Sequence, residues 1–241
     1  MKGVILAGGK GTRLWPLTAI ANKHLLPVYN KPMIIYPLET LKHLGVKDIL
    51  IVSGGEHIGW FTEFLGDGSG FGVNLTYRVQ REAGGIAQAL SLAKEFTKED
   101  NMAVILGDNI FDNNYIEIVK NKKKNEAVLY VKKVDDASLF GVIEIGKNGK
   151  LIGIEEKPKI PKSNIAVTGL YIYPPNVFEI ISKLKPSSRN ELEITDINNY
   201  YIKNKKCIYK EILGFWSDAG TFDSLLRSAN WVKRNDNNFA N

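Results

Sequence analysis

A glycine-rich loop with a fixed positive charge lies near the start of the chain. Residues 6–14 read Leu-Ala-Gly-Gly-Lys-Gly-Thr-Arg-Leu and follow a short apolar run, residues 3–7, that predicts a buried strand. Three glycines let the backbone N–H groups approach a phosphate, and Arg13 offers a planar, permanently charged fork. The loop therefore predicts a triphosphate site, although a plain glycine turn with Arg13 on the surface stays open.

This loop departs from two familiar phosphate-binding motifs. Gly11 follows Lys10 where the Walker motif needs Ser or Thr, and Val4 stands at the position of its first glycine. Leu14 occupies the place of the third glycine in the dinucleotide fingerprint. Neither a P-loop nor a dinucleotide site is therefore predicted.

Two aspartates at separate places suit a divalent cation. Asp108 follows the predicted buried strand at residues 102–106, and Asp218 lies in the turn at residues 216–221. Mg²⁺ prefers a few carboxylates together with phosphate oxygens and water. The pair predicts a magnesium site, while an Asx turn or helix cap at Asp108 and a plain turn at Asp218 remain alternatives.

A glutamine follows a third predicted strand, at residues 73–79. The Gln80 amide can donate and accept at once, which matches the O4 and N3–H edge of thymine or uracil. Gly85 permits a close backbone approach to the same base. The alternatives are an exposed glutamine at a strand end and a glycine that only begins a helix.

The first half of the chain alternates short β-branched runs with helical patterns. Such alternation predicts parallel strands, right-handed crossovers and helices on both faces of the sheet. The expected strands span residues 3–7, 48–53, 73–79 and 102–106, and the expected helices span 32–44, 61–65 and 85–96. Because ligands bind beyond the carboxyl ends of such strands, the loop and Asp108 are expected to share one crevice.

After Glu126 the pattern changes to strands with short connections. It predicts antiparallel or mixed additions to the same sheet, followed by three helices. These strands are expected at residues 127–131, 140–145, 151–155 and 167–173, and the helices at 176–184, 195–204 and 222–233. The predicted fold class is α/β, with a Rossmann-like mixed, mainly parallel sheet in a single domain over residues 1–241.

Composition excludes several classes of protein. The 241 residues carry a net charge of +6, but the lysine runs at 120–124 and 203–206 lack interleaved aromatics and are interpreted as solvated helix ends, without a nucleic-acid partner. No stretch approaches the roughly 18 to 20 apolar residues of a membrane span, and the start does not resemble a secretory signal, so a cytoplasmic location is expected. A lone Cys207 and three scattered histidines make a zinc cluster implausible, so any metal should bind oxygen.

Ten blocks of sequence, in order, resemble the sugar-phosphate nucleotidyltransferases. Within that family the chain is most similar to the thymidylyltransferases that use glucose 1-phosphate, in a short form without their C-terminal helical extension. The blocks together span residue 3 to about residue 230, and they lie at residues 6–18, 22–28, 31–34, 79–80, 85–89, 106–111, 155–158, 167–171, 191–198 and 216–221.

The resemblance implies a fold, the nucleotide-diphospho-sugar transferase fold, and a reaction. dTTP or UTP would react with α-D-glucose 1-phosphate to give dTDP-glucose or UDP-glucose and pyrophosphate. The sugar phosphate would attack the α-phosphorus in line, so that no protein nucleophile is needed and catalysis is positioning plus charge stabilisation. Residues 1–125 would mainly bind the nucleotide, residues 126–233 mainly the sugar phosphate, and residues 234–241 would form a frayed tail.

The resemblance also implies roles for individual residues. Arg13, Lys23, Asp108 and Lys157 would be catalytic, and Mg²⁺ would lie on Asp108 and Asp218. The nucleotide would contact Leu6, Gly8, Gly9, Gly11, Thr12, Arg13, Lys23, Gln80, Gly85 and Asp108. The sugar phosphate would contact Asn109, Gly141, Glu156, Lys157, Thr168 and Trp216. His24, beside Lys23, is interpreted as a packing or hydrogen-bonding residue and not as a base.

Some positions depart from the family pattern. Many relatives carry an aspartate where this chain has Gly84, and Ser217 and Ala219 replace the Leu and Thr that relatives often have. With little sequence after residue 230, regulation by end product and the usual tetramer are not expected, and a homo-oligomer is left open.

Two other functions are weighed against this one. A nucleotide-sugar-dependent glycosyltransferase would show an Asp-x-Asp motif, whereas residues 106–109 contain one aspartate. A non-catalytic nucleotide-sugar sensor would be expected to lose Arg13 or Asp108, and both are present.

Overall fold

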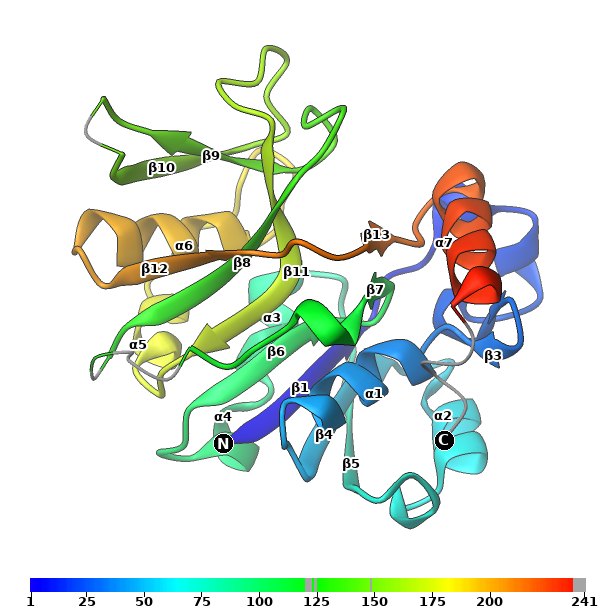
Figure 1. Cartoon of the computed structure of the whole chain (residues 1–241). Helices are drawn as coiled ribbons and strands as arrows, with labels where there is room; N and C mark the ends of the chain where they lie inside the picture. The colour runs from blue at the N-terminus through cyan, green and yellow to red at the C-terminus, as the bar shows by residue number, and fades with distance from the viewer. Residues whose placement is uncertain (120–122, 124, 148, 236–241) are drawn as a thin grey trace.

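A mixed sheet of nine strands runs through the computed structural model, which describes residues 1–119, 123, 125–147 and 149–235 (Figure 1). Seven strands lie in the order β10-β9-β11-β6-β1-β4-β5, and β8 and β12 extend the sheet from β11. The strands are β1 (Lys2–Ala7), β4 (Asp48–Gly54), β5 (Asn74–Gln80), β6 (Met102–Leu106), β8 (Ala127–Lys133), β9 (Gly141–Ile145), β10 (Leu151–Glu156), β11 (Ile165–Tyr173) and β12 (Cys207–Glu211).

Helices cover both faces of the parallel half, which consists of β5, β4, β1 and β6. Side chains of β1 alternate between two cores, so Val4 and Leu6 pack with α3, α5 and α6, while Ile5 and Ala7 pack with α1 and α2. The α-helices are α1 (Ile35–His43), α2 (Ile58–Leu65), α3 (Ile86–Ser91), α4 (Lys94–Thr97), α5 (Val177–Ile181), α6 (Ile194–Lys203) and α7 (Phe222–Arg234). Burial on both faces explains why these strands are apolar throughout.

The strand β11 divides between two neighbours and so opens the sheet. Ala166 pairs with β9, whereas Leu170 and the residues after it pair with β6, both antiparallel. On its other edge β11 pairs with β8, and the register of that pairing shifts between Val167 and Tyr171. Thr168 and Gly169 lie in this irregular stretch, at the rim of a cavity.

Short elements bring distant segments to the same edge of the sheet. β13 pairs antiparallel with β7 and places Asp218 opposite Asn109. The short strands are β2 (Pro27–Val28), β3 (Lys31–Pro32), β7 (Asn109–Phe111) and β13 (Trp216–Asp218), and the 3₁₀ helices are η1 (Thr12–Leu14), η2 (Leu17–Ala19), η3 (Lys23–Leu25), η4 (Ser69–Phe71) and η5 (Asn113–Tyr115). A capping box of Thr221 and Ser224 starts α7 directly after this turn.

The predicted fold class agrees with the structure, but several elements differ from the prediction. Residues 216–218, expected to lie in a turn, form the strand β13, and the helix expected over 176–184 ends at Ile181. The helix expected over 32–44 begins at Ile35, because residues 31–32 pair with residues 27–28. The helix expected over 85–96 is two helices, α3 and α4, separated by a turn. No strand was expected where β12 lies; it is a half-exposed edge strand that pairs parallel with β8, so its sequence carries little apolar signal.

The chain ends and lysine runs are only partly within the described residues. Lys203 is the last residue of α6, as expected for a solvated helix end, whereas residues 120–122 and 124 of the other run lie outside the described residues. Of the tail predicted to be frayed, residues 236–241 also lie outside them, and Arg234 still belongs to α7. In the described part of the chain, no helix combines the length and the apolarity that crossing a membrane requires.

Candidate active site

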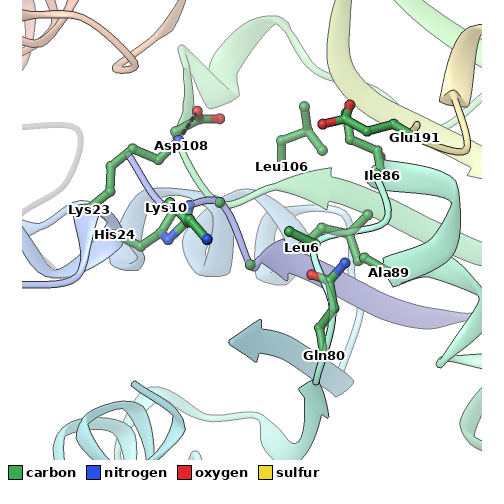
Figure 2. Close-up of a pocket in the computed structure, with 14 residues that line it drawn as sticks. Leu6, Lys10, Lys23, His24, Gln80, Ile86, Ala89, Leu106, Asp108 and Glu191 are labelled. Carbon is green, nitrogen blue, oxygen red and sulfur yellow. Dashed lines mark hydrogen bonds and ion pairs between the residues drawn. The ribbon is translucent and has the colours of Figure 1, made fainter. Parts of the chain in front are cut away.

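A cavity of about 380 Å³ lies beyond the carboxyl ends of β1, β5 and β6, where the sequence predicted a crevice. Figure 2 shows Lys10, Lys23 and Asp108 toward one side and Gln80 and Ala89 toward the other. The apolar side chains of Leu6, Ile86 and Leu106 also line it. This first cavity is lined by Leu6, Gly8, Gly9, Lys10, Lys23, His24, Gln80, Ala83, Gly85, Ile86, Ala89, Leu106, Asp108 and Glu191.

The glycine loop needs its glycines for two separate reasons. The amide of Gln80 packs so closely on Gly8 that a Cβ there would overlap with its Oε1 atom. Gly11 has a φ of 67°, in the left-handed region, and its carbonyl accepts from the Thr18 hydroxyl at 3.0 Å. The loop backbone therefore bends beside the first cavity, and its lack of side chains lets Gln80, Thr18 and Lys23 pack directly against it.

Lys23 and Asp108 form a nearly buried ion pair. The Nζ atom of Lys23 lies 2.6 Å from Oδ2 of Asp108, and the side chains are 10% and 14% exposed. Burial alone would raise the pKa of Asp108, but the Lys23 ammonium and a hydrogen bond from Asn109 hold it well below the usual range. Asp108 is thus a carboxylate at every pH at which the protein is expected to work.

His24 is a packing residue, as the sequence suggested. Its ring lies against Gly107, its Nδ1 atom is 3.0 Å from Oδ1 of Asn22, and the residue is buried. Burial, with the charge of Lys23, lowers the pKa of His24 to about 3. The ring is therefore neutral near pH 7.

A second cavity of about 220 Å³ adjoins the first, and the two share Ile86, Leu106 and Asp108. Its walls come from β7, β9, β10, β11, α6 and β13, so that segments far apart in sequence meet here. It is lined by Arg13, Ile86, Leu106, Asp108, Asn109, Leu139, Phe140, Gly141, Glu156, Lys157, Val167, Thr168, Gly169, Tyr171, Ile194, Thr195, Asn198, Trp216 and Asp218.

Asn109 connects three parts of this second cavity. Its Nδ2 donates to Oδ1 of Asp108 at 2.9 Å, and its Oδ1 accepts from the N–H of Gly169 at 2.9 Å and from Nε1 of Trp216 at 2.7 Å. The residue is 1% exposed. Because the amide is held at both ends, its position and that of the Asp108 carboxylate are coupled.

Two further side chains of this cavity are constrained by their surroundings. Oε2 of Glu156 accepts from the Thr195 hydroxyl at 2.6 Å. Lys157 has a φ of 46°, in the left-handed region that side chains rarely adopt, and its N–H donates to the carbonyl of Phe140 at 3.0 Å. Strained backbone of this kind often marks a functional position, and here it is found at a cation predicted to bind phosphate.

Asp218 and Asp108 lie close enough to influence each other. Burial raises the pKa of Asp218 and the Asp108 charge raises it further, while Arg13 and Lys23 act in the opposite sense. A Cβ on Gly220 would stand 2.9 Å from Nη2 of Arg13 and 3.1 Å from Oδ2 of Asp218, so both groups lie beside Gly220. Arg13, although exposed, is therefore directed to this cavity.

The carboxylates of Asp108 and Asp218 both line the second cavity, and two carboxylates alone do not form a complete cage for a cation. Among the residues that the structure describes, no group of three or more His, Cys, Asp or Glu side chains could hold a metal ion. Two oxygen donors with mutual repulsion still fit Mg²⁺, which completes its shell with phosphate oxygens and water. The donor set is thus compatible with a metal that arrives with a polyphosphate.

Nearly all residues predicted for the site come together around these two cavities. Two do not line either one: Gly11 and Thr12, which belong to the loop itself. Sequence reasoning missed several lining residues. Thr195 and Glu191 lie within the block at 191–198 and Lys10 within the glycine loop, so the motifs contained them, but only the tertiary structure shows that they face the cavities.

The sequence profile described as "Nucleotidyl transferase" matches residues 2–235. The chain belongs to this nucleotidyl transferase family. A protein of Neisseria meningitidis serogroup A named glucose-1-phosphate thymidylyltransferase is 44% identical over 239 residues, which cover 97% of this chain and 83% of that protein. The predicted family is therefore confirmed.

Solved structures agree with the fold of this nucleotidyl transferase. A crystal structure from Bacillus anthracis, described as a candidate glucose-1-phosphate thymidylyltransferase in complex with a sucrose, superposes with a TM-score of 0.90 at 52% identity and covers 97% of this chain and 95% of that one. A UDP-glucose pyrophosphorylase complexed with UDP-glucose superposes with a TM-score of 0.80 at 25% identity, covering 97% and 98%. The predicted fold class is confirmed by both.

The geometry of the nucleotidyl transferase site defines its chemical capacity. Asp108 pairs with Lys23 where the two cavities join. The first cavity is an apolar slot with the Gln80 amide, and the second is a polar pocket that contains Glu156. Such a site can bring two anionic molecules together around Asp108. The individual residue roles stay predictions at this point.

Proposed function

We propose that this nucleotidyl transferase converts dTTP and α-D-glucose 1-phosphate into dTDP-glucose and pyrophosphate. UTP is the alternative nucleotide and would give UDP-glucose. The observation that carries the proposal is the pair of adjoining cavities that share Asp108. The names of the relatives support the same reaction. Thymidylyl transfer is favoured over uridylyl transfer, because the structure with the thymidylyltransferase description is 52% identical and the UDP-glucose pyrophosphorylase 25%.

Charge repulsion is the main obstacle to this reaction, since both substrates are anions. Two unit charges about 4 Å apart interact by roughly 4 kcal/mol at an effective dielectric near 20, more than a neutral hydrogen bond contributes. Arg13 and the loop amides would bind the triphosphate, Lys23 would stand at the reacting phosphates, and Lys157 would hold the sugar phosphate. The oxygen of the sugar phosphate then attacks the α-phosphorus in line, and the bond to pyrophosphate breaks.

A divalent ion, proposed to be Mg²⁺, belongs to this mechanism. Asp108 and Asp218 would hold it, since both line the second cavity and the charge of Asp108 raises the pKa of Asp218. When bound, the ion supplies positive charge that neutralises phosphate oxygens. Lys23, which pairs with Asp108 at 2.6 Å, would then be available to the substrate phosphates.

The sugar would bind in the second cavity, which adjoins the first at Asp108. Glu156, held by Thr195, can accept from two hydroxyl groups, and the buried Asn109 has its orientation fixed. Gly141, Thr168 and Trp216 complete the proposed sugar contacts. Of these, the Thr168 hydroxyl already donates to the carbonyl of Tyr130 at 2.8 Å, so it would offer the sugar an acceptor.

The base would lie in the apolar slot of the first cavity. Leu6 and Ile86 line that slot, and Gln80 presents its amide within it. Gly85 lines the slot with a φ of 95°, and a side chain there would collide with the backbone of Leu192, so only glycine fits this turn. A pyrimidine, with its single ring, is the proposed occupant.

The remaining expectations follow from this activity. We take residues 1–241 as one domain whose partners are small molecules and not nucleic acid or a membrane. A cytoplasmic location is part of the proposal, because nucleoside triphosphates are cytoplasmic metabolites.

One assay panel tests the proposal. The protein with Mg²⁺ is incubated with each of dTTP, UTP, dCTP and ATP against several sugar 1-phosphates, and pyrophosphate and nucleotide sugar are both measured. We expect dTDP-glucose and pyrophosphate in equal amounts, without an added acceptor. In a parallel incubation with a nucleotide sugar and a sugar acceptor, transfer of the sugar to the acceptor with release of the nucleoside diphosphate would instead identify a glycosyltransferase. Binding without turnover in either incubation would identify a sensor.

A further inference from the structure

A second glutamine holds the amide of Gln80. Nε2 of Gln80, at the end of β5, donates to Oε1 of Gln88 on α3 at 2.7 Å. Gln80 is 8% exposed and lines the first cavity, whereas Gln88 does not line it. Gln88 can therefore act on a ligand only through Gln80.

The contact distinguishes the two ends of the Gln80 amide. A carboxamide has two N–H donors on one side and an acceptor oxygen on the other, and the two arrangements have nearly the same shape. With one N–H directed to Gln88, the nitrogen faces α3 and Oε1 packs against Gly8. A free amide could rotate by half a turn and exchange these positions.

The helix and the preceding loop keep Gln88 in place. Gly84 lies against its side chain, because a Cβ on Gly84 would stand 3.0 Å from Cγ of Gln88. The turn from β5 to α3 thus connects the two glutamines, and Gly85 at its end lines the same cavity. This connection therefore holds the two side chains against each other, with the Gln80 nitrogen as the donor.

We propose, on the basis of the proposed function, that Gln88 is a positioning residue that makes the base site select thymine or uracil against cytosine. Thymine presents an acceptor at O4 and a donor at N3–H, whereas cytosine presents a donor at N4 and an acceptor at N3. An amide locked in one orientation matches one of these patterns and opposes the other. A mobile amide accommodates both and discriminates poorly.

Three substitutions at one position separate orientation from packing. Gln88→Met keeps the length of the side chain without a hydrogen bond. Gln88→Glu offers only acceptors and holds the Gln80 amide as it is, whereas Gln88→Lys offers only donors and favours the reversed amide. Ser91→Ala, which removes a hydroxyl that donates to the backbone carbonyl of Gln88 at 2.7 Å, serves as the control on the same helix.

The measured quantity is the ratio of kcat/KM for dTTP to that for dCTP, with glucose 1-phosphate and Mg²⁺. The ratio cancels effects on phosphate binding and on the fraction of folded protein, which alter both nucleotides equally. We expect Gln88→Met to lower it about tenfold, mainly through KM for dTTP, and Gln88→Lys to lower it further, while Gln88→Glu and Ser91→Ala stay within about threefold of the original.

Two results would overturn the role of Gln88. One is an unchanged ratio in Gln88→Met, and the other is an equal loss in Gln88→Met and Gln88→Glu. The proposed function would fail in a different way, through the absence of dTDP-glucose formation by the unaltered protein. In that case titration calorimetry with dTTP and dCTP measures the same preference without turnover, and equal affinities in the unaltered protein would refute the role of Gln88.

Discussion

The ammonium group of Lys23 lies 2.6 Å from Oδ2 of Asp108, and this nearly buried pair stands where the two cavities join. The ammonium group of Lys23 thus pairs with the same carboxylate that we propose as a ligand of the metal. Loading of the metal and release of Lys23 toward the substrate are therefore expected to be linked.

Asp108→Asn tests the role of that carboxylate. The substitution keeps the shape and removes the charge, so we expect turnover to fall roughly 10²-fold or more, as for other positioned electrostatic groups. Steady-state kinetics at saturating Mg²⁺ measure the effect, and a urea unfolding curve shows that the protein is still folded. A near-normal turnover number would remove Asp108 from the mechanism.

Gln80→Ala tests the reading of the base. Loss of the amide leaves the edge of the pyrimidine without its partner, so KM for dTTP should rise by roughly tenfold, while KM for glucose 1-phosphate stays unchanged. Initial rates with varied dTTP, UTP and ATP measure both the KM values and the nucleotide preference. Retention of the full preference for pyrimidines over purines would show that other groups read the base.

Trp216→Phe tests the network around Asn109. The indole Nε1 donates to Oδ1 of Asn109 at 2.7 Å, and phenylalanine removes this donor while it keeps a ring beside Phe140. We expect a loss of about 1–3 kcal/mol in the free energy of unfolding and a several-fold rise in KM for glucose 1-phosphate. Urea unfolding and substrate kinetics measure the two effects. A destabilised variant with unaltered KM for the sugar phosphate would make the contact purely structural.

Asp218→Asn should lower the turnover number and raise the stability of the folded protein. Burial and the Asp108 charge raise the pKa of Asp218 above its usual 3.8, so the folded state binds the proton more tightly than the unfolded state. In the unaltered protein this stabilising effect is present below pH 3.8 and is lost as pH rises through the raised pKa. The neutral variant should therefore unfold at a higher temperature at pH 7, while its turnover falls roughly 10²-fold.

Thermal unfolding at several pH values measures the stability part of this prediction. The advantage of Asp218→Asn should shrink as the pH falls through the raised pKa of Asp218, because that side chain then becomes neutral in the parent protein as well. An Asp218→Asn variant that is less stable than the parent at pH 7 would contradict the assigned effect of burial.

The local pattern of apolar residues and glycines was enough to predict much of the fold. The run at residues 102–106 matches β6 at both ends, and the buried strand before the glycine loop is β1, extended by one residue. Strands covered on both faces are apolar throughout, and few residues other than glycine can occupy a sharply bent backbone. Both features can therefore be recognised from a short stretch of sequence. The edge strand β12 left little signal, because none of its five side chains is fully buried.

The sequence by itself determined the chemical groups of this protein: the glycine loop, its cations, the two aspartates and the amide at Gln80. Only the tertiary structure decided which of them meet. Asp218 reaches the cavity of Asp108 through the pairing of β13 with β7, Thr195 of α6 supports Glu156 of β10, and Gln88 faces Gln80. These contacts join elements distant in the chain or on either side of a turn, and their register is set by the packing of the whole core, which no local spacing of residues encodes.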